Sequence, residues 1–199
     1  EQEEVMFLFS IPEEPAPQRG QAEYLEKYIS GISEGDKEAL AGLYESTHAA
    51  VYGFALSLCK NTHDAEDVLQ DVFLQIWNAA GQYTAAGKPM AWIFTITRNL
   101  SLQSLSRKGK VVPLPAEELP EQFEEAPHLT SEDRIVLESL LNMLGDEERQ
   151  IVVLHALSEM KHREIASLLH LPLPTVLSKY RRAIKKLGNI VKEADSDRK

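Results

Sequence analysis

The sequence predicts an all-α protein with two small helical domains joined by an acidic, Pro-rich linker. Apolar residues recur three and four positions apart through most of the chain, and no sustained alternating run of β-branched residues indicates a strand. Between residues 109 and 130 this periodicity gives way to four prolines and five glutamates, a composition that cannot bury a core. The 199 residues, 43% of them hydrophobic, suffice for a compact core on each side of that linker.

The first predicted domain, residues 21–108, contains four amphipathic segments. The first ends near residues 31–35. Asp36 is placed to cap the start of the second, and Asn61 is placed to end it. The third runs from about residue 64 to residue 80, with carboxylates in its first turn, where the helix dipole favours negative charge. Residues 81–88 form a loop, and Pro89 opens a fourth helix that runs to about residue 107, because its missing N–H needs no partner there.

The second predicted domain, residues 131–192, contains a helix-turn-helix. Ser131 and Asp146 are placed to cap two helices, followed by a short helix over residues 161–169, a turn over 170–172 and a last helix from about 173 to 191. Two helices separated by three residues, the second of them basic, are typical of this motif. We expect Ala166 to let the two helices approach, with the space between them filled by Ile165, Leu168, Val176 and Ile184.

The charge distribution favours a nucleic-acid partner for this second domain. The formal net charge of −10 alone argues against DNA binding, which depends on Lys and Arg. Residues 149–192, however, hold nine basic side chains against two acidic ones, a local excess of seven positive charges. In the last helix we expect residues of the first turn to contact the edges of the DNA bases. We expect the Lys and Arg residues that follow to contact phosphates. The expected base contacts are Thr175, Leu177 and Ser178, and the expected phosphate contacts are Lys179, Arg181, Arg182 and Lys185.

Composition weighs against several other classes of protein. The one cysteine, Cys59, excludes an internal disulfide framework and a cysteine-based zinc cage, and is expected to be a small buried hydrophobe. No apolar run is long enough for a membrane span or a signal peptide, so we expect a cytoplasmic protein without membrane insertion. No histidine pair has the spacing of a zinc site, and His155 and His162 are expected at the surface or in a turn. We therefore expect no metal, no cofactor and no enzymatic activity.

Three segments together resemble the extracytoplasmic-function (ECF) sigma factors of bacteria, over about residues 22–107 and 131–191. "DAEDVLQDVFLQIW", residues 64–77, resembles the family's helix that docks on the RNA polymerase clamp. "KPMAWIFTITRNL", residues 88–100, resembles its helix that recognises and helps melt the minus-ten promoter element. "EIASLLHLPLPTVLSKYRRAIKKL", residues 164–187, resembles its helix-turn-helix for the minus-thirty-five element. Finding all three in this order, with an acidic linker between them, makes the resemblance specific.

The resemblance implies partners and site residues. It implies binding to the clamp and flap regions of core polymerase, to promoter DNA and to an anti-sigma factor. Trp92 and Phe94 lie near a loop and ahead of basic residues, an aromatic and cationic combination typical of single-stranded DNA binding, although Trp92 could instead support the loop that contacts the base. The implied polymerase contacts are Asp64, Glu66, Asp67, Gln70 and Asp71, and the implied downstream DNA contacts are Trp92, Arg98, Asn99, Arg107 and Lys108.

The sequence departs from the family pattern at several positions and leaves alternatives open. Residues 174–179 are Pro-Thr-Val-Leu-Ser-Lys where the family commonly has Gly-Thr-Val-Lys-Ser-Arg, Gln103 replaces a frequent acidic residue, and His170 replaces a frequent glycine. A helix-turn-helix regulator, or a sigma-like decoy that binds a protein without directing polymerase, is the alternative function. The N-terminal extension, residues 1–20, and the tail, residues 193–199, have no predicted role.

Overall fold

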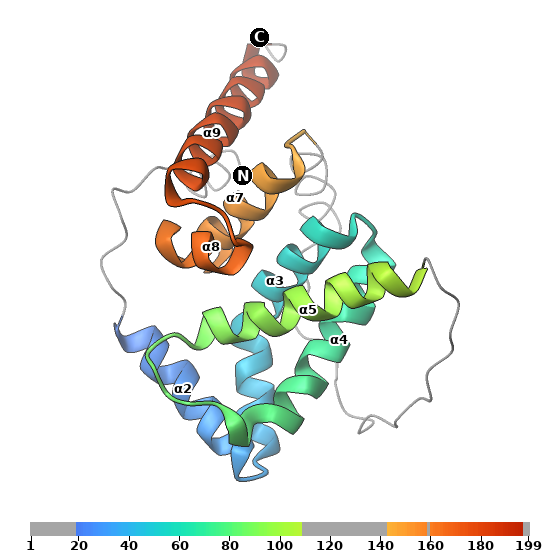
Figure 1. Cartoon of the computed structure of the whole chain (residues 1–199), viewed down its shortest axis with the longest axis vertical. Helices are drawn as coiled ribbons and strands as arrows, with labels where there is room; N and C mark the ends of the chain where they lie inside the picture. The colour runs from blue at the N-terminus through green and yellow to red at the C-terminus, as the bar shows by residue number, and fades with distance from the viewer. Residues whose placement is uncertain (1–18, 109–142, 159, 197–199) are drawn as a thin grey trace. The chain divides into compact units, whose positions relative to one another are not determined.

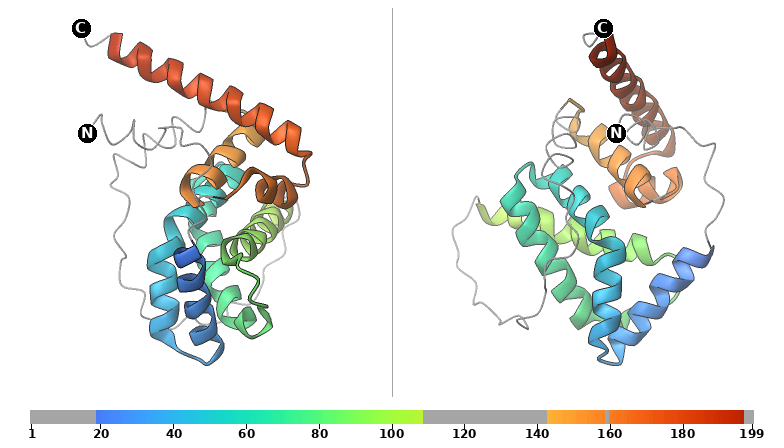
Figure 2. Two further views of the ribbon diagram at one scale, coloured as in Figure 1. Left: turned by 90° about the vertical axis from the view of Figure 1, so that its left-hand side faces the viewer. Right: turned by 180° about the vertical axis from the view of Figure 1, so that it is seen from behind.

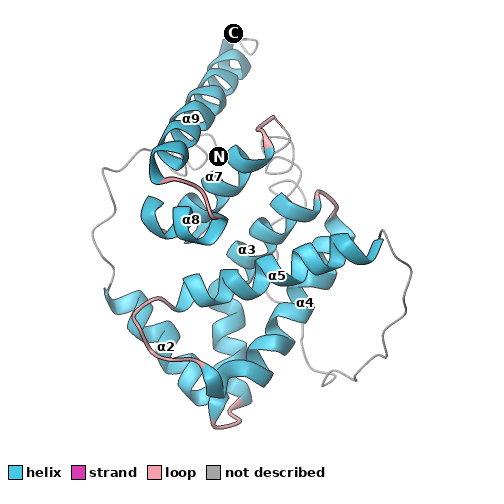
Figure 3. Ribbon diagram, in the orientation of Figure 1, coloured by secondary structure: helices cyan, strands magenta, loops and turns pink. Residues whose placement is uncertain are grey.

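The computed structural model of the chain describes residues 19–108, 143–158 and 160–196, which belong to two compact units. Within these ranges the chain forms helices and no strand, as Figure 3 shows, which confirms the predicted all-α class. None of the described helices is both long and apolar enough to span a membrane. The predicted linker and the helix expected after Ser131 lie outside the described residues.

The first unit is a helical bundle around α3. Its elements are α2 (Arg19–Ser33), α3 (Lys37–Cys59), α4 (Thr62–Ala79), the short 3-10 helix η1 (Ala80–Gln82) and α5 (Pro89–Lys108) (Figure 1). Helix α3 packs against α2, α4 and α5, and every residue from 50 to 57 is buried. A helix that is buried all round needs neighbours on all sides, which explains why α3 is the centre of this unit. Cys59 lies in this core, as predicted.

The connections between these helices are short and differ in one detail from the expectation. The Asp36 carboxylate accepts hydrogen bonds from the N–H groups of Glu38 (2.8 Å) and Ala39 (3.3 Å), so it caps α3 as predicted. Asn61 does not close α3, because Lys60 does so in the left-handed conformation (φ 57°). Asn61 instead caps α4, its side-chain oxygen accepting from the Asp64 N–H at 3.0 Å. One residue therefore ends α3 and the next begins α4.

The second unit comprises α7 (Asp146–Ser158), α8 (His162–Leu169) and α9 (Leu173–Ser196). The two further views in Figure 2 show α9 as the longest helix of this unit, extending well beyond the contact with the two shorter ones. Asp146 is the first residue of α7 rather than its cap, since the Gly145 carbonyl accepts the first helical hydrogen bond, from the Arg149 N–H at 2.8 Å. Helix α9 packs on both α7 and α8.

Candidate nucleic-acid interface

Helices α8 and α9 form the predicted helix-turn-helix. His170 ends α8 in the left-handed conformation (φ 55°), the position where the family pattern has glycine. The chain then turns so that the Leu171 N–H donates to the Ala166 carbonyl at 3.0 Å. The Pro172 carbonyl accepts from the N–H groups of Thr175 (2.9 Å) and Val176 (3.1 Å), which starts α9. Pro174 is tolerated because it lies in this first turn, where its missing N–H has no intrahelical partner.

The burial of three residues agrees with the predicted packing between the two helices, and that of Ile184 does not. Ile165 and Val176 are completely buried, Ala166 is nearly so, and Leu168 is half-buried. Ile184 is half-buried too, but it packs on the α7 side of α9. Farther along α9, its inner face closes a small apolar cluster on α7, made of Leu144, Val152, Ala183 and Leu187. These contacts determine which face of α9 points away from the unit.

The outward face of α9 holds two of the predicted phosphate contacts. Positions 174, 178, 181 and 185 share one side of the helix by its 3.6-residue period, and all four residues there are exposed. Arg181 and Lys185 therefore present their charges to solvent, and Ser178 lies between the start of the helix and these two basic residues. Thr175 and Leu177 lie on the two flanks and are half-buried.

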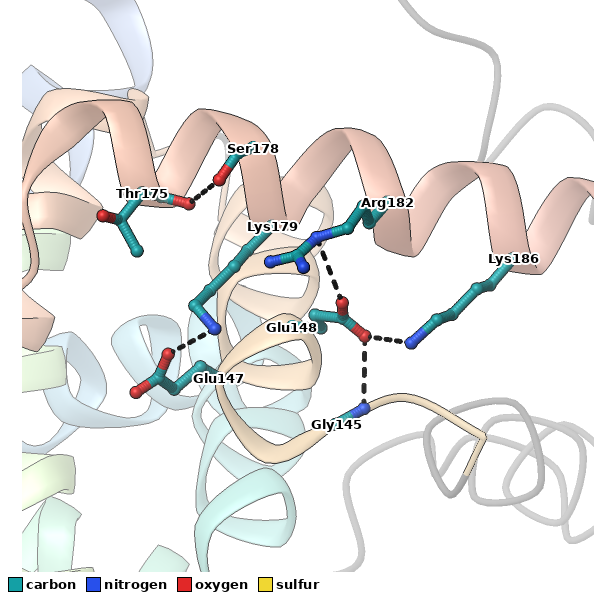
Figure 4. Close-up of polar contacts among 8 residues, drawn as sticks. All are labelled: Gly145, Glu147, Glu148, Thr175, Ser178, Lys179, Arg182 and Lys186. Atoms are coloured by element: carbon teal, nitrogen blue, oxygen red, sulfur yellow. Dashed lines mark hydrogen bonds and ion pairs between the residues drawn. The ribbon is translucent and has the colours of Figure 1, made fainter.

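The other two predicted phosphate contacts already bind carboxylates of α7 (Figure 4). Lys179 Nζ lies 2.8 Å from Glu147 Oε2, and its side chain is 24% exposed. Arg182 Nε lies 3.8 Å from Glu148 Oε1, and Lys186 Nζ lies 2.6 Å from Glu148 Oε2. A DNA phosphate must share or displace these carboxylates to bind Lys179 or Arg182, although Arg182 is itself 61% exposed. Arg181 and Lys185 are exposed on the outward face, away from these carboxylates.

Glu148 is the buried centre of these ion pairs. Its side chain is 9% exposed, and its carboxylate also accepts a hydrogen bond from the Gly145 N–H at 3.3 Å. The hydrogen bond from Lys186 lowers the pKa of Glu148, and the Gly145 amide and the charge of Arg182 act in the same direction against desolvation, which raises it. The carboxylate thus stays ionised and holds the basic flank of α9 against α7.

Two features of this unit differ from the sequence interpretation. Arg149, counted in the basic segment, is buried and donates from Nη2 to the Leu144 carbonyl at 3.1 Å, so it adds nothing to a DNA-facing surface. His155 and His162 are not surface or turn residues: they are half-buried, with ring centroids 4.4 Å apart. Both rings contact Tyr180 edge-on at 4.8 Å, so one aromatic cluster joins α7, α8 and α9. The spacing of Tyr180 four residues after the buried Val176 was the available signal for this cluster.

The residues expected to contact the downstream element lie on α5 but not on one face of it. Trp92 is half-buried and packs against Tyr83, with ring centroids 5.0 Å apart. Asn99, seven residues on, shares this face and is exposed, whereas Arg98 is half-buried on a different side of the helix. Arg107 is exposed, and the side chain of Lys108 lies outside the described part of the chain.

Phe94 does not contribute to an aromatic surface, contrary to the expectation. It is completely buried and meets Phe54 of α3 edge-on, with centroids 5.3 Å apart. Its role is to attach α5 to the central helix. Tyr83, which sequence reasoning did not single out, takes its place beside Trp92 because the loop after η1 brings it there.

The acidic residues of α4 lie on the side opposite its buried face. Glu66, Asp67, Gln70 and Asp71 are exposed, and Asp64 is half-buried. His63 Nδ1 lies 3.3 Å from Asp67 Oδ2. Desolvation raises the pKa of Asp71, while the nearby Arg107 guanidinium lowers it. Arg107, expected to contact DNA, is therefore close enough to influence a residue expected to contact polymerase. Among the described residues, no group of three potential metal ligands is present.

Two family models match the chain, one in each unit. The model described as sigma-70 region 2 matches residues 43–111, and the one described as sigma-70, region 4, matches residues 134–187. The ECF RNA polymerase sigma factor SigE of Mycolicibacterium smegmatis is 30% identical over 175 residues, which cover 82% of this chain and 66% of that protein. SigW of Bacillus subtilis, also named as an ECF sigma factor, is 25% identical over 171 residues, covering 79% and 91%.

Solved structures of similar fold agree with these matches. CnrH in complex with the cytosolic domain of CnrY gives a TM-score of 0.60 at 22% identity, covering 85% of this chain and 98% of that one. RpoE of Bartonella quintana, in complex with the anti-sigma factor NepR, gives a TM-score of 0.54 at 25% identity, covering 73% and 92%. Helix α2, residues 19–33, precedes the residues that the region 2 model matches.

Proposed function

The chain belongs to the sigma-70 family of RNA polymerase sigma factors, in its ECF group, and from this membership we infer that it binds core polymerase and directs it to specific promoters. The observation that supports this most strongly is the presence of both regions in one chain, in order. The first match covers most of α3 and the rest of the first unit after it, and the second includes a helix-turn-helix with an exposed basic face. A regulator that needs only one DNA element has no use for the first unit.

We assign the upstream promoter element to the second domain, proposed as residues 131–192. Arg181 and Lys185 contact phosphates from the outward face of α9, and Lys179 and Arg182 add to them where a phosphate displaces Glu147 or Glu148. Ser178, Thr175 and Leu177 lie near the start of the helix, where base edges are reached. Because Leu177 stands where the family commonly has lysine, this helix makes one polar contact fewer.

We assign the downstream element to the first domain, proposed as residues 21–108. Trp92, which packs against Tyr83 of the loop, and Asn99 share one face of α5, where Asn99 is exposed and Trp92 is half-buried. Arg98, Arg107 and Lys108 supply positive charge on other sides of the same helix and attract the backbone of a single strand.

The acidic side of α4 is the proposed polymerase surface. Its exposed carboxylates oppose the buried face and suit a basic partner, for which charge complementarity promotes fast and specific association. The exposed carboxylates are Glu66, Asp67 and Asp71, and the half-buried Asp64 and the amide of Gln70 complete the proposed surface.

The proposal also covers the linker, the regulation of the chain and its location in the cell. Residues 109–130 link the two domains along the polymerase surface, and residues 1–20 are an extension. Of the expected tail, residues 193–199, the first four belong to α9, which ends at Ser196 rather than near residue 191. The relative from Bartonella quintana is solved with an anti-sigma factor, so we propose that a protein of that kind regulates this chain too. The action is by binding, in the cytoplasm, with no covalent chemistry.

In-vitro transcription tests the proposed function. Core polymerase from the native host is incubated with the purified full chain and a library of genomic fragments, and the transcript starts are mapped. We expect new starts that share two sequence elements at a fixed spacing and that are absent with core alone. If the chain binds core normally yet directs no initiation on any fragment, the assignment is wrong and the decoy alternative takes its place.

A further inference from the structure

The loop between η1 and α5 is exposed and is joined to α2 by hydrogen bonds. Residues 84–88 are all exposed, and Tyr83 before them is half-buried. The loop makes few backbone hydrogen bonds of its own: the Tyr83 N–H donates to the Ala80 carbonyl at 3.1 Å at its start. Gly87 adopts φ 68°, a conformation that other residues rarely take. The Tyr83 side chain also contacts the backbone of Ala86 and Lys88, and a contact from outside the loop adds to these.

A single carboxylate of α2 joins the two ends of this loop. Glu26 Oε1 accepts a hydrogen bond from Tyr83 Oη at 3.0 Å and another from the Gly87 N–H at 2.8 Å. These residues are 57 and 61 positions away in sequence, and Figure 1 shows the loop running beside α2. Hydrogen bonds to an ionised acceptor are about twice as strong as those between neutral groups, so this one side chain is a strong anchor.

The anchor also positions the aromatic pair beside the loop. Burial and the bond to Glu26 raise the pKa of Tyr83 to about 12, so the phenol stays a neutral donor at physiological pH. The Tyr83 ring in turn packs on Trp92, which is half-buried against the core of the unit. Glu26 thus controls, through Tyr83 and Gly87, both the loop backbone and the aromatic contact next to it.

We propose that Glu26 is a positioning residue that holds the loop over residues 83–88 ready to bind single-stranded DNA of the downstream element. This rests on the proposed function of the first domain. A loop already ordered before binding loses less conformational freedom when it binds, so its anchor raises affinity without touching the ligand. Glu26 lies on α2, ahead of the residues that the region 2 model matches, so the family comparison does not assign it this role.

The test compares Glu26→Ala, which removes both bonds, with Glu26→Gln, which keeps an oxygen acceptor, and with Glu23→Ala as a control on an exposed position of the same helix. Holoenzyme reconstituted with each full chain is titrated with a fluorescent single-stranded oligonucleotide carrying a downstream element from the mapped promoters. We expect Glu26→Ala to weaken binding by about tenfold, the effect expected from losing charged hydrogen bonds. Glu26→Gln, which keeps an acceptor but loses its charge, should bind between Glu26→Ala and the unchanged chain, and Glu23→Ala should bind as the unchanged chain does.

Two further measurements separate positioning from general unfolding. Hydrogen exchange at the Gly87 amide should quicken in Glu26→Ala and stay slow in Glu26→Gln, since that amide donates to Glu26. Binding of Glu26→Ala holoenzyme to duplex upstream element should be unchanged. Equal losses for the single strand and the duplex, or full single-strand affinity in Glu26→Ala, overturn the proposal while leaving the sigma assignment standing. If the unchanged holoenzyme binds no downstream strand at all, both proposals fail.

Discussion

At the scale of single residues, Glu148 shows how the second domain organises its charges. Its carboxylate is nearly buried between Lys186, Arg182 and the Gly145 amide, and its loss leaves two cations of α9 without their partner on α7. Glu147, one residue earlier, binds Lys179 from a side chain that is 48% exposed. Since exposed ion pairs contribute little and buried charged hydrogen bonds contribute more, these neighbours should differ in their effect on stability.

Glu148→Gln should lower the free energy of unfolding by about 1 to 3 kcal/mol at neutral pH, because it removes the charge from nearly buried hydrogen bonds. The pKa of Glu148 is lowered in the folded chain, so the unfolded chain binds more protons and the stabilisation is present above the usual value of 4.5. It is lost as the pH falls through the lowered pKa. Urea unfolding between pH 7 and pH 3 should therefore show the two proteins converging in acid.

Glu147→Gln is the matched control and should change the free energy of unfolding by less than about 1 kcal/mol. If both substitutions have the same effect, or if the Glu148→Gln difference does not shrink as the pH falls, the buried ion pair does not have the stabilising role assigned to it.

Arg181 and Lys185 are the basic residues of α9 that are exposed on its outward face. Replacing both with Ala should weaken binding to duplex promoter DNA and reduce the slope of log affinity against log salt by about 2, close to one for each lost phosphate contact. The measurement is fluorescence anisotropy of holoenzyme with an upstream-element duplex between 50 and 300 mM salt, about the range where such slopes are resolved. Lys27→Ala with Lys37→Ala removes the same charge from exposed positions of the first unit. An unchanged slope in the α9 variant, or equal changes in both, contradicts the placement of this helix on DNA.

At the scale of elements, helix periodicity predicted which segments are helical but not what covers each face. The apolar spacing of α4 and α5 depends only on each segment's own residues, so both helices were predicted to within about two residues at each end. The burial of Phe94 depends on Phe54, forty residues away on α3, and the burial of His155 depends on α8 and α9. Such partners are set by tertiary packing, which a local pattern does not contain.

The dependence on tertiary packing also explains why only part of the candidate site could be predicted from the sequence. The order of the motifs and the basic last helix predicted the segment proposed to bind DNA, but all four predicted phosphate contacts looked alike in sequence. Only the packing of α9 on α7 separates Lys179 and Arg182, which bind carboxylates, from Arg181 and Lys185, which do not face α7. Glu26 was missed because its two partners follow it by about sixty residues.

The turn between α8 and α9 carries a local strain that a substitution can remove. His170 holds φ at 55°, and the left-handed conformation costs a non-glycine residue about 1 to 2 kcal/mol. His170→Gly should therefore raise the free energy of unfolding by about 1 kcal/mol, less than the full strain because glycine also gains freedom in the unfolded chain. Thermal or urea unfolding measures it. Ser167→Gly, at an exposed helical position of α8, should instead lower stability. A loss of stability in His170→Gly contradicts this description of the turn.

At the scale of the whole molecule, the chain combines a net charge of −10 with a locally basic last helix. The acidic surface of α4 and the outward face of α9 belong to different units, so one chain can offer opposite charges to two partners. Repulsion from the overall negative charge should also limit nonspecific DNA binding by the free protein, since binding to phosphates depends on local cations.

Reversing the charge of α4 should impair assembly with polymerase. Glu66→Lys with Asp67→Lys places two positive charges on the exposed side of α4, and we expect association with core polymerase to slow by about tenfold or more at low salt, with a smaller effect at high salt. Stopped-flow association with labelled core provides the rate. Glu23→Lys with Glu45→Lys makes the same change in net charge on α2 and α3 and should leave the rate close to that of the unchanged chain. Equal slowing in both variants would show that α4 is not part of the polymerase interface.

Run-off transcription from one mapped promoter, with its upstream element, its downstream element or neither replaced, tests most directly whether the two domains recognise the two elements. We expect each replacement to reduce initiation by the unchanged chain. We also expect the Arg181→Ala, Lys185→Ala variant to lose much of its response to the upstream replacement while keeping its response to the downstream one. Transcript levels that respond to neither element, or a variant that responds to both exactly as the unchanged chain does, contradict the claim that the two domains recognise the two elements.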